Sequence, residues 1–378
     1  MRPASAVERR RLNDTFARLC AIPSPFGSEK AMAEAVAREL GAMGVDVEED
    51  GVAGEVGAEC GNLLARIPGR GERTILLCAH LDTVPEAGVI EPVLEDGGWV
   101  SRGDTILGAD NKAAVAVILE VARRCAVESS PVGLELLFTV SEENALAGAK
   151  AFDVATLRSE WGYVFDHASP IGEIIDASPT YYRWEADFRG TPAHAGIRPE
   201  DGRSAIEAAA RAIGAMTLGR IDEQTTANVG SIEGGQRGGT NIVAARCKVV
   251  GEVRSLQASR AEDVVAEIIA HAHDAANTPH CFCDVDVTTA RLFDGYGHAP
   301  DAPAVLAAEQ ALRARGYTPT RRPTGGGSDA NAFEASGFHC TNLANGTERN
   351  HEPDERVSVA ALEGMLDVTY ALLDACSD

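Results

Sequence analysis

Positive charge is scarce in this sequence of 378 residues. It carries 34 lysine and arginine residues against 57 aspartate and glutamate residues, which gives a formal net charge of -23 at pH 7. Such a chain repels the phosphate backbone of nucleic acids and anionic lipid headgroups, so we expect neither as a partner. Most of the carboxylates are expected to form a solvated acidic surface, although some of them could bind metal ions.

Long apolar runs and targeting segments are also missing. The first residues, MRPASAVERRRLNDTFARLC, contain arginines but no apolar core and no small-residue cleavage site, so they predict a first helix and not a signal peptide. The apolar stretch AAVAVILEVARRC is interrupted by Glu120 and is shorter than the roughly 20 residues that span a bilayer. We therefore expect a cytoplasmic protein that does not enter membranes.

The nine cysteines form no recognisable disulfide or zinc-binding pattern. Only Cys281 and Cys283 are close in sequence, and their spacing fits a strand better than a zinc knuckle. An odd number of scattered cysteines predicts reduced and mostly buried thiols.

Two patterns of hydrophobicity divide the chain. From Arg9 to about Pro170, helical periodicity alternates with continuous apolar strands, which is typical of an α/β domain whose sheet is covered on both faces. Between 173 and 287, strands of alternating polarity and two helices predict a small α+β domain with its helices on one face. The α/β pattern then returns. We therefore expect a discontinuous α/β domain, 1–172 and 288–378, with an inserted domain at 173–287.

Side chains that commonly bind metals stand at the ends of five segments of the predicted sheet. In chain order they are His80, Asp82, Asp110, Glu142, Glu143, Asp166 and His351. Because ligands gather at the carboxyl ends of strands in α/β sheets, we expect these groups to meet. Each has an ordinary explanation when taken alone, such as a helix cap or a solvated glutamate. Together they would bury several unpaired charges at several kcal/mol each, and a pair of divalent cations removes that cost.

Seven motifs resemble a known family in their order and spacing: HLDTV, GADNK, SEEN, FD, GTPAHAG, TGGGSDANAF and HEPDE. The family is that of the co-catalytic zinc exopeptidases, which include peptidase T, carboxypeptidase G and acetylornithine deacetylase. LGADNKAAVAVILE and GGGSDANAF are most similar to the tripeptide aminopeptidase branch. The resemblance implies that the α/β domain is catalytic, that the insert is a lid and dimerisation domain, and that a homodimer releases N-terminal residues from short peptides.

The same resemblance implies a two-metal site. Its first metal would be bound by His80, Asp110 and Asp166, and its second by Asp110, Glu143 and His351, with Asp110 bridging. Nitrogen and oxygen ligands without thiolate fit zinc, although these ligand types leave cobalt and manganese open. Glu142 is implied as the general base. Asp82 lies two residues from His80 on the same strand face, so we expect it to accept the other imidazole proton and fix the tautomer.

Residues of the insert are implied to complete the site. His194 would reach the active site of a partner subunit and stabilise the oxyanion of the tetrahedral intermediate. Arg254 would bind a substrate carboxylate with help from Asn241. The cluster TGGGSD lacks the lysine of a phosphate loop, so we interpret Gly326 and Gly327 as points of close backbone approach to substrate, with a plain tight turn as the alternative. Ser328 is expected to cap the following helix.

Other functions remain open at this stage. An N-acyl amino acid deacylase or a carboxypeptidase would use the same mechanism, and a binding or scaffold protein could keep the fold without the chemistry. Glu352 and the segment NALAG depart from the usual residues of the family beside the predicted pocket, so they leave the substrate preference open. Because base, ligands and lid histidine are all present, we expect an enzyme.

Overall fold

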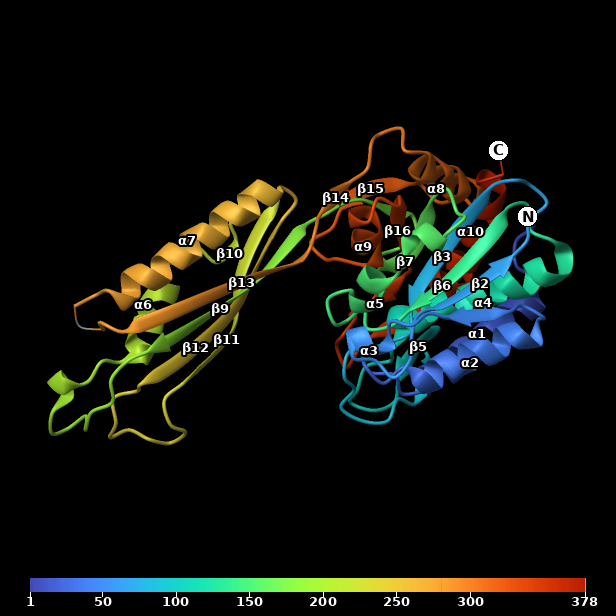
Figure 1. The fold of residues 1–378 in the computed structure, drawn as a ribbon. Helices are drawn as coiled ribbons and strands as arrows, with labels where there is room; N and C mark the ends of the chain where they lie inside the picture. The colour runs from blue at the N-terminus through green and yellow to red at the C-terminus, as the bar shows by residue number, and fades with distance from the viewer. Residues whose placement is uncertain (280, 378) are drawn as a thin grey trace. The chain divides into compact units, whose positions relative to one another are not determined.

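The computed structural model describes residues 1–279 and 281–377 (Figure 1). Contacts divide the chain into two compact units, one formed by Met1–Ala177 with Gly297–Asp378 and the other by Ser178–Tyr296. The sequence placed the insert at 173–287. By contacts, the second unit continues beyond 287 because β13 (Asp284–Phe293) pairs with β9 (Thr180–Arg189) as far as Phe293.

The first unit is built on a mixed sheet of nine strands in the described part of the chain, in the order β1-β2-β6-β3-β7-β16-β8-β14, with β15 paired to β8. These strands are β1 (Val47–Glu49), β2 (Leu63–Ile67), β3 (Thr74–His80), β6 (Gly133–Thr139), β7 (Gly162–His167), β8 (Glu173–Ser178), β14 (Tyr296–Gly297), β15 (Thr320–Pro323) and β16 (Cys340–Ala344). The four central strands β6, β3, β7 and β16 are parallel to one another. Their carboxyl ends therefore lie at one edge of the sheet.

Helices pack on this sheet from both faces. They are α1 (Ala6–Cys20), α2 (Lys30–Ala42), α3 (Ala53–Val56), α4 (Ala109–Glu128), α5 (Ala147–Ala151), α8 (Pro303–Ala314), α9 (Asp329–Ala335) and α10 (Val359–Ala375). Ile75, Leu77 and Ala79 of β3 join the large apolar core that includes α4. Cys78, which lies between Leu77 and Ala79 in the strand, points the other way and contacts Asp329 of α9. Burial on alternate sides explains why β3 has a continuous apolar sequence, and the expected α/β class is confirmed.

A small second sheet lies within the first unit, and the sequence analysis did not anticipate it. Its order is β17-β18-β5-β4, formed by β17 (Thr347–Glu348), β18 (Arg356–Ser358), β5 (Gly98–Ser101) and β4 (Pro92–Glu95). Strands β17 and β18 pair antiparallel. The loop between them carries His351, so this hairpin places the last predicted ligand.

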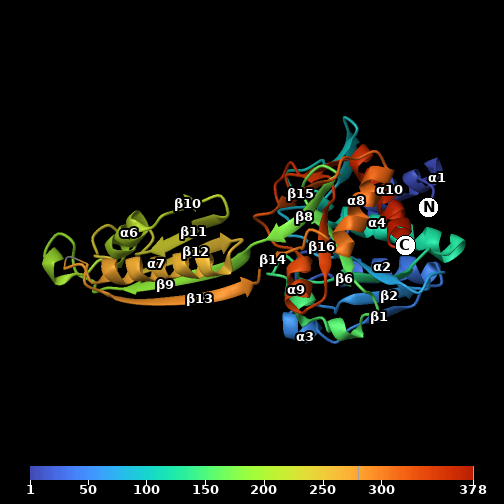
Figure 2. The same cartoon turned by 90° about the horizontal axis from the view of Figure 1, so that it is seen from above.

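The second unit is an antiparallel sheet with two helices. Its order is β10-β11-β12-β9-β13, where β10 is Gly219–Arg220, β11 is Thr225–Gly234 and β12 is Arg246–Ser255. Helices α6 (Ala205–Ala215) and α7 (Ala258–Ala276) pack on β9 and β12, and Figure 2 shows α7 lying along this sheet. Alternate residues of β12 are buried, which matches its alternating sequence. The predicted one-sided α+β domain is confirmed.

Two expectations from composition can be compared with the fold. The nine cysteines have free thiols, and all are buried except the half-buried Cys283. Among the helices of 1–279 and 281–377, none is both long and apolar enough to cross a bilayer.

Candidate metal centre

The predicted metal ligands meet at the carboxyl edge of the central sheet. His80 ends β3, Asp110 stands in the first turn of α4, and Asp166 lies near the end of β7. The adjacent Glu142 and Glu143 follow β6, which is parallel to β3 and pairs His80 with Thr139. The strand order β6-β3-β7 thus brings together side chains that are far apart in sequence.

Asp110 lies at the centre of the group. One carboxylate oxygen, Oδ1, is 3.3 Å from Nε2 of His80, and the other, Oδ2, is 3.3 Å from Nε2 of His351. His80 Nε2 also lies 3.9 Å from Asp166 Oδ1, and His351 Nε2 lies 2.8 Å from Glu143 Oε1. The two oxygens of Asp110 therefore face two different clusters of ligand-type atoms.

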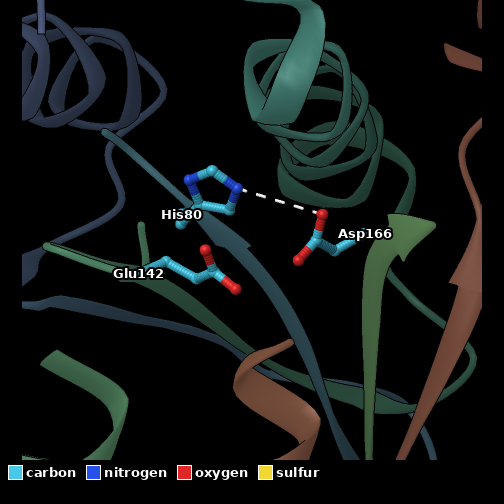
Figure 3. A group of neighbouring side chains, drawn as sticks. All are labelled: His80, Glu142 and Asp166. Atoms are coloured by element: carbon cyan, nitrogen blue, oxygen red, sulfur yellow. Dashed lines mark ion pairs between the residues drawn. The ribbon is translucent and has the colours of Figure 1, made fainter. Parts of the chain in front are cut away.

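Two overlapping sets of side chains have the geometry of a metal site. Ligand atoms of His80, Glu142 and Asp166 lie within 4.8 Å of one another, and so do those of His80, Asp110 and Glu143. Figure 3 shows the first set, with the imidazole of His80 and the two carboxylates directed toward one another. Each glutamate of the pair therefore belongs to a different set.

The protonation behaviour of these groups shows strong repulsion between like charges. Burial, and then the charge of Asp166, raises the pKa of Glu142 well above its ordinary value. Burial and Asp110 likewise raise the pKa of Asp166 well above its ordinary value. Burial alone would also raise the pKa of Asp110, but hydrogen bonds from His351 and His80 outweigh it and lower that pKa. The buried carboxylates therefore outnumber the positive charges that could neutralise them.

Divalent cations fit this donor set. Hydrogen bonds to Asp110 and Glu143 raise the pKa of His351 to about 10. Without a metal ion, the His351 imidazole therefore carries a proton on the nitrogen that would bind the metal. A bound metal displaces such protons and offsets the repulsion between the carboxylates. The donors are imidazole nitrogens and carboxylate oxygens, and neither of the two sets contains a thiol. This combination suits zinc, cobalt or manganese.

Asp82 contacts His80 through both its main chain and its carboxylate. His80 Nδ1 lies 3.0 Å from the main-chain oxygen of Asp82 and 3.4 Å from its carboxylate Oδ1, so the main chain provides the shorter contact. The carboxylate accepts main-chain hydrogen bonds from Glu142 at 3.0 Å and from Glu143 at 2.9 Å. Asp82 therefore holds the main chain of the glutamate pair as well as facing the histidine.

Three supporting residues were missed by the sequence analysis. Glu355, only 1% exposed, accepts main-chain hydrogen bonds from Leu107 at 2.8 Å, Gly108 at 2.7 Å and Asp110 at 2.9 Å. Asn350 donates from Nδ2 to Asp110 Oδ2 at 2.8 Å. Asn342 pairs with the main chain of Asp166 through two hydrogen bonds of 2.9 Å. Glu355 and Asn350 flank His351 closely in sequence, which is the one signal that could have drawn attention to them.

Gly325 and Gly326 of the TGGGSD cluster have free space where a side chain would begin. A Cβ atom at Gly325 would meet nothing within 4 Å, and one at Gly326 would meet only Thr324 Oγ1 at 3.7 Å. Steric contacts of a Cβ atom therefore do not explain Gly325 and Gly326, and close approach of a substrate at Gly326 and Gly327 stays a prediction. Ser328 begins α9 and forms a capping box with Asn331, as expected.

Within the second unit, the structure brings two of the predicted residues together and separates the third. His194 forms an isolated strand bridge with Ile242, and the main-chain N–H of Ala195 donates to the oxygen of Asn241 at 2.9 Å. His194 is exposed. This segment lies next to the residues that lead into β12, since Val243 N–H donates to Ala193 oxygen at 2.9 Å.

Arg254 lies near the other end of β12. Eight strand positions separate Arg246 from Arg254, which corresponds to about 27 Å at about 3.4 Å for each residue. Arg254 forms two 3.2 Å contacts with the carboxylate of Glu252, and its guanidinium lies 4.2 Å from the ring centroid of Tyr181. The pair of His194 and Asn241 is therefore well separated from Arg254 in one chain.

Comparison with known proteins identifies the family. The model "Peptidase family M28" matches residues 62–167, and the M20 "Peptidase dimerisation domain" matches residues 180–278. The structure of aminopeptidase PepT from Bacillus cereus ATCC 10987 is 35% identical, with 98% of this chain and 99% of that chain covered and a TM-score of 0.88. The chain belongs to the M20/M28 family of peptidases.

Further relatives place this peptidase near peptidase T. A tripeptidase from Staphylococcus aureus is 31% identical over 98% of both chains, with a TM-score of 0.92. An uncharacterized protein of Bacillus subtilis, YqjE, is 35% identical over 97% of this chain and 99% of its own length. The predicted resemblance is confirmed, and the second unit of this M20/M28 peptidase contains the residues that match the family's dimerisation domain.

The repulsion between carboxylates leads to a test on the metal-free peptidase. Asp166→Asn should raise Tm in the absence of metal, because it removes a buried carboxyl that ionises less readily in the folded state than in the unfolded chain. The unfolded carboxyl ionises near pH 4, so the advantage of the variant should grow from about pH 5 to pH 8. Zinc at 100 times Kd should stabilise the wild type by about 2.7 kcal/mol and the variant by much less.

Thermal unfolding of chelator-treated protein, with and without added zinc, measures both effects. Glu95→Gln changes an exposed carboxylate of β4 and is the control, for which neither quantity should move. A metal-free Asp166→Asn protein less stable than the wild type at pH 8 would show that like-charge repulsion does not dominate this cluster.

Proposed function

We propose that this protein is a two-metal aminopeptidase that releases N-terminal residues from short peptides. The observation that carries the proposal is Asp110, a buried carboxylate whose two oxygens face His80 and His351 separately at 3.3 Å. One carboxylate placed in this way can bridge two cations. Similarity to an aminopeptidase and to a tripeptidase over nearly the whole chain supports peptide hydrolysis by this centre.

The proposed ligands divide into two sets that share Asp110. One metal would be held by His80, Asp110 and Asp166, and the other by Asp110, Glu143 and His351. When bound, such a pair of cations lowers the pKa of a water molecule and polarises the carbonyl oxygen of the peptide bond. Zinc is the metal we propose because of the nitrogen and oxygen donor set.

Glu142 is the proposed general base. Its carboxyl is buried beside His80 and Asp166, and burial raises its pKa, which makes it a better proton acceptor than an exposed glutamate. In the proposed mechanism Glu142 accepts a proton from the attacking water and delivers it to the amine that leaves. Asp82 keeps the main chain of Glu142 and Glu143 in place, so the two adjacent side chains can serve different roles.

A dimer is proposed to complete the site. Because His194 with Asn241 and Arg254 lie near opposite ends of β12, we propose that one active site does not take all three from the same chain. We propose that His194 and Asn241 serve the metal centre of the partner subunit, where His194 stabilises the oxyanion, and that Arg254 serves its own. The dimerisation domain matched at 180–278 supports this arrangement.

A substrate assay separates the proposal from related activities. Zinc-loaded protein should release the first residue from a free-amine tripeptide and leave the N-acetylated form of the same peptide intact, as read by mass spectrometry. An N-acyl amino acid deacylase would instead remove the acyl group, and a carboxypeptidase would release the last residue from both forms. Absence of all three reactions would favour a binding or scaffold protein.

The two adjacent glutamates should respond differently to substitution. Glu142→Ala should keep both metals and lose at least about 100-fold in kcat, because the general base is gone. Glu143→Ala should lose one metal. Metal content by elemental analysis, measured beside kcat, checks the assignment. The reverse pattern, with metal lost from Glu142→Ala and retained in Glu143→Ala, would exchange their roles.

Arg254 should recognise the free carboxylate of the peptide. Amidating the C-terminus of a tripeptide should lower kcat/KM by an amount that corresponds to roughly 1.5 to 3 kcal/mol, as expected for the loss of a charge-assisted hydrogen bond. In Arg254→Ala the free and amidated peptides should be cleaved equally well. If the wild type already cleaves both alike, Arg254 does not bind this carboxylate, and its pairing with Glu252 is structural.

Mixed dimers test which residues come from which chain. Glu142→Ala and His194→Ala homodimers should each be nearly inactive, whereas refolding them together in equal amounts should restore about a quarter of wild-type activity. About half of the dimers are then mixed, and each mixed dimer has one intact site. The matched control pairs Glu142→Ala with Arg254→Ala, which should show no recovery because both residues act in the same chain. Recovery in the control and none in the first mixture, with subunit exchange demonstrated, would reverse the assignment.

A further inference from the structure

The turn that carries Glu142 and Glu143 has an uncommon backbone. Ser141, two residues after the end of β6, has a φ of 53°, which lies in the left-handed region that residues other than glycine seldom adopt. Such a conformation costs on the order of 1 kcal/mol or more and persists only where surrounding contacts enforce it. The proposed base is the next residue, so the direction of its side chain depends on what holds Ser141.

Two buried carboxylates hold this turn. The main-chain N–H groups of Glu142 and Glu143 donate to Asp82, as described above. The preceding N–H, that of Ser141, donates to Oε1 of Glu29 at 3.0 Å, and the Ser141 hydroxyl lies 3.1 Å from the same oxygen. Three successive main-chain donors are therefore satisfied by Asp82 and Glu29.

Glu29 is itself fixed by its surroundings. It has no exposed surface, it occupies the N-cap position of α2, and its Oε1 also accepts the main-chain N–H of Gly27 at 2.8 Å. The segment before it is tied to the residues after β3, since Phe26 N–H donates to Thr83 oxygen at 3.0 Å and Thr83 N–H donates to Ser24 oxygen at 2.9 Å. Glu29 thus connects the end of β3, which carries His80, to the turn after β6.

We infer that Glu29 is a positioning residue that sets the orientation of Glu142 by holding Ser141 in its left-handed conformation. This inference rests on the proposed role of Glu142 as the base. Glu29 belongs to neither set of metal-type ligands. Without it, the buried N–H and hydroxyl of Ser141 lose their acceptor, and the turn rearranges to recover hydrogen bonds. A small displacement of the carboxylate of the neighbouring Glu142 then slows proton transfer without removing the base.

Three substitutions of Glu29 test this role in the full-length, zinc-loaded protein. Glu29→Ala should lower kcat about 10- to 100-fold while KM changes by less than about threefold and both metals remain bound. Glu29→Asp keeps the charge but is too short to reach Ser141, so it should be impaired as well. Glu29→Gln should restore most of kcat, because the amide oxygen can replace Oε1. The other oxygen, Oε2, has no hydrogen-bond partner among the residues that the structure describes, so the amide nitrogen replaces no existing bond.

Glu135, in the strand β6 that precedes the turn, offers a matched control. It is fully buried in β6 and accepts two main-chain hydrogen bonds and one serine hydroxyl, from Arg158 N–H at 2.9 Å, Ser159 N–H at 2.9 Å and the Ser159 hydroxyl at 2.6 Å. None of these partners is a ligand or the base. Glu135→Ala should therefore lower Tm as Glu29→Ala does, and kcat of the folded protein should not change.

The outcomes separate a positioning role from a structural one. If Glu29→Ala loses stability but keeps wild-type kcat, as expected for Glu135→Ala, then Glu29 is structural and the inference is wrong. If Glu29→Gln is as slow as Glu29→Ala, geometry at Oε1 does not explain the effect, which also overturns it. These outcomes differ from a failure of the proposed function, in which the wild type itself would not cleave the tripeptide.

Discussion

Several carboxylates must be buried side by side at the carboxyl edge of one sheet, and this constraint governs the first unit. The structure meets it in two ways. Asp110, Glu142, Glu143 and Asp166 face one another and two histidines, where cations can offset their repulsion. Around them, Glu29, Asp82 and Glu355 direct their oxygens to main-chain N–H groups, which stabilise a negative charge without any cation.

The outer carboxylates have a common geometry. Each takes its hydrogen bonds from a segment that bears a proposed ligand or the base: Ser141 beside Glu142 for Glu29, the glutamate pair for Asp82, and the start of α4 for Glu355. Because main-chain donors are rigid, these bonds fix the direction of the chain more firmly than contacts between two flexible side chains would. The centre is therefore supported by the backbone of its own loops.

The inner group could be predicted from the sequence, whereas in the outer group only Asp82 could be. The end of an apolar strand such as β3 can be recognised in the sequence, and His80 and Asp166 lie at such ends. Neighbouring parallel strands then bring the two side chains together. By contrast, Glu29 in SPFGSEK has the same local sequence character as a solvated glutamate, because the acceptor role depends on Ser141, 112 residues away. His351 was expected as a ligand, but the hairpin that carries it was not, because the two-residue β17 and the three-residue β18 are too short to show a periodic pattern.

The position of β16 in the sheet has a consequence for the order in which the protein is made. This strand comes from the C-terminal part of the first unit, yet it lies between β7 and β8, which precede the second unit in sequence. The same late segment supplies His351, Asn350 and Glu355. A chain still emerging from the ribosome therefore has an unfinished sheet with an unpaired edge at β7 and an incomplete ligand set. On the proposed function, hydrolysis by this centre can begin only after synthesis has passed the last strands, so a nascent copy would carry no peptidase activity into its surroundings.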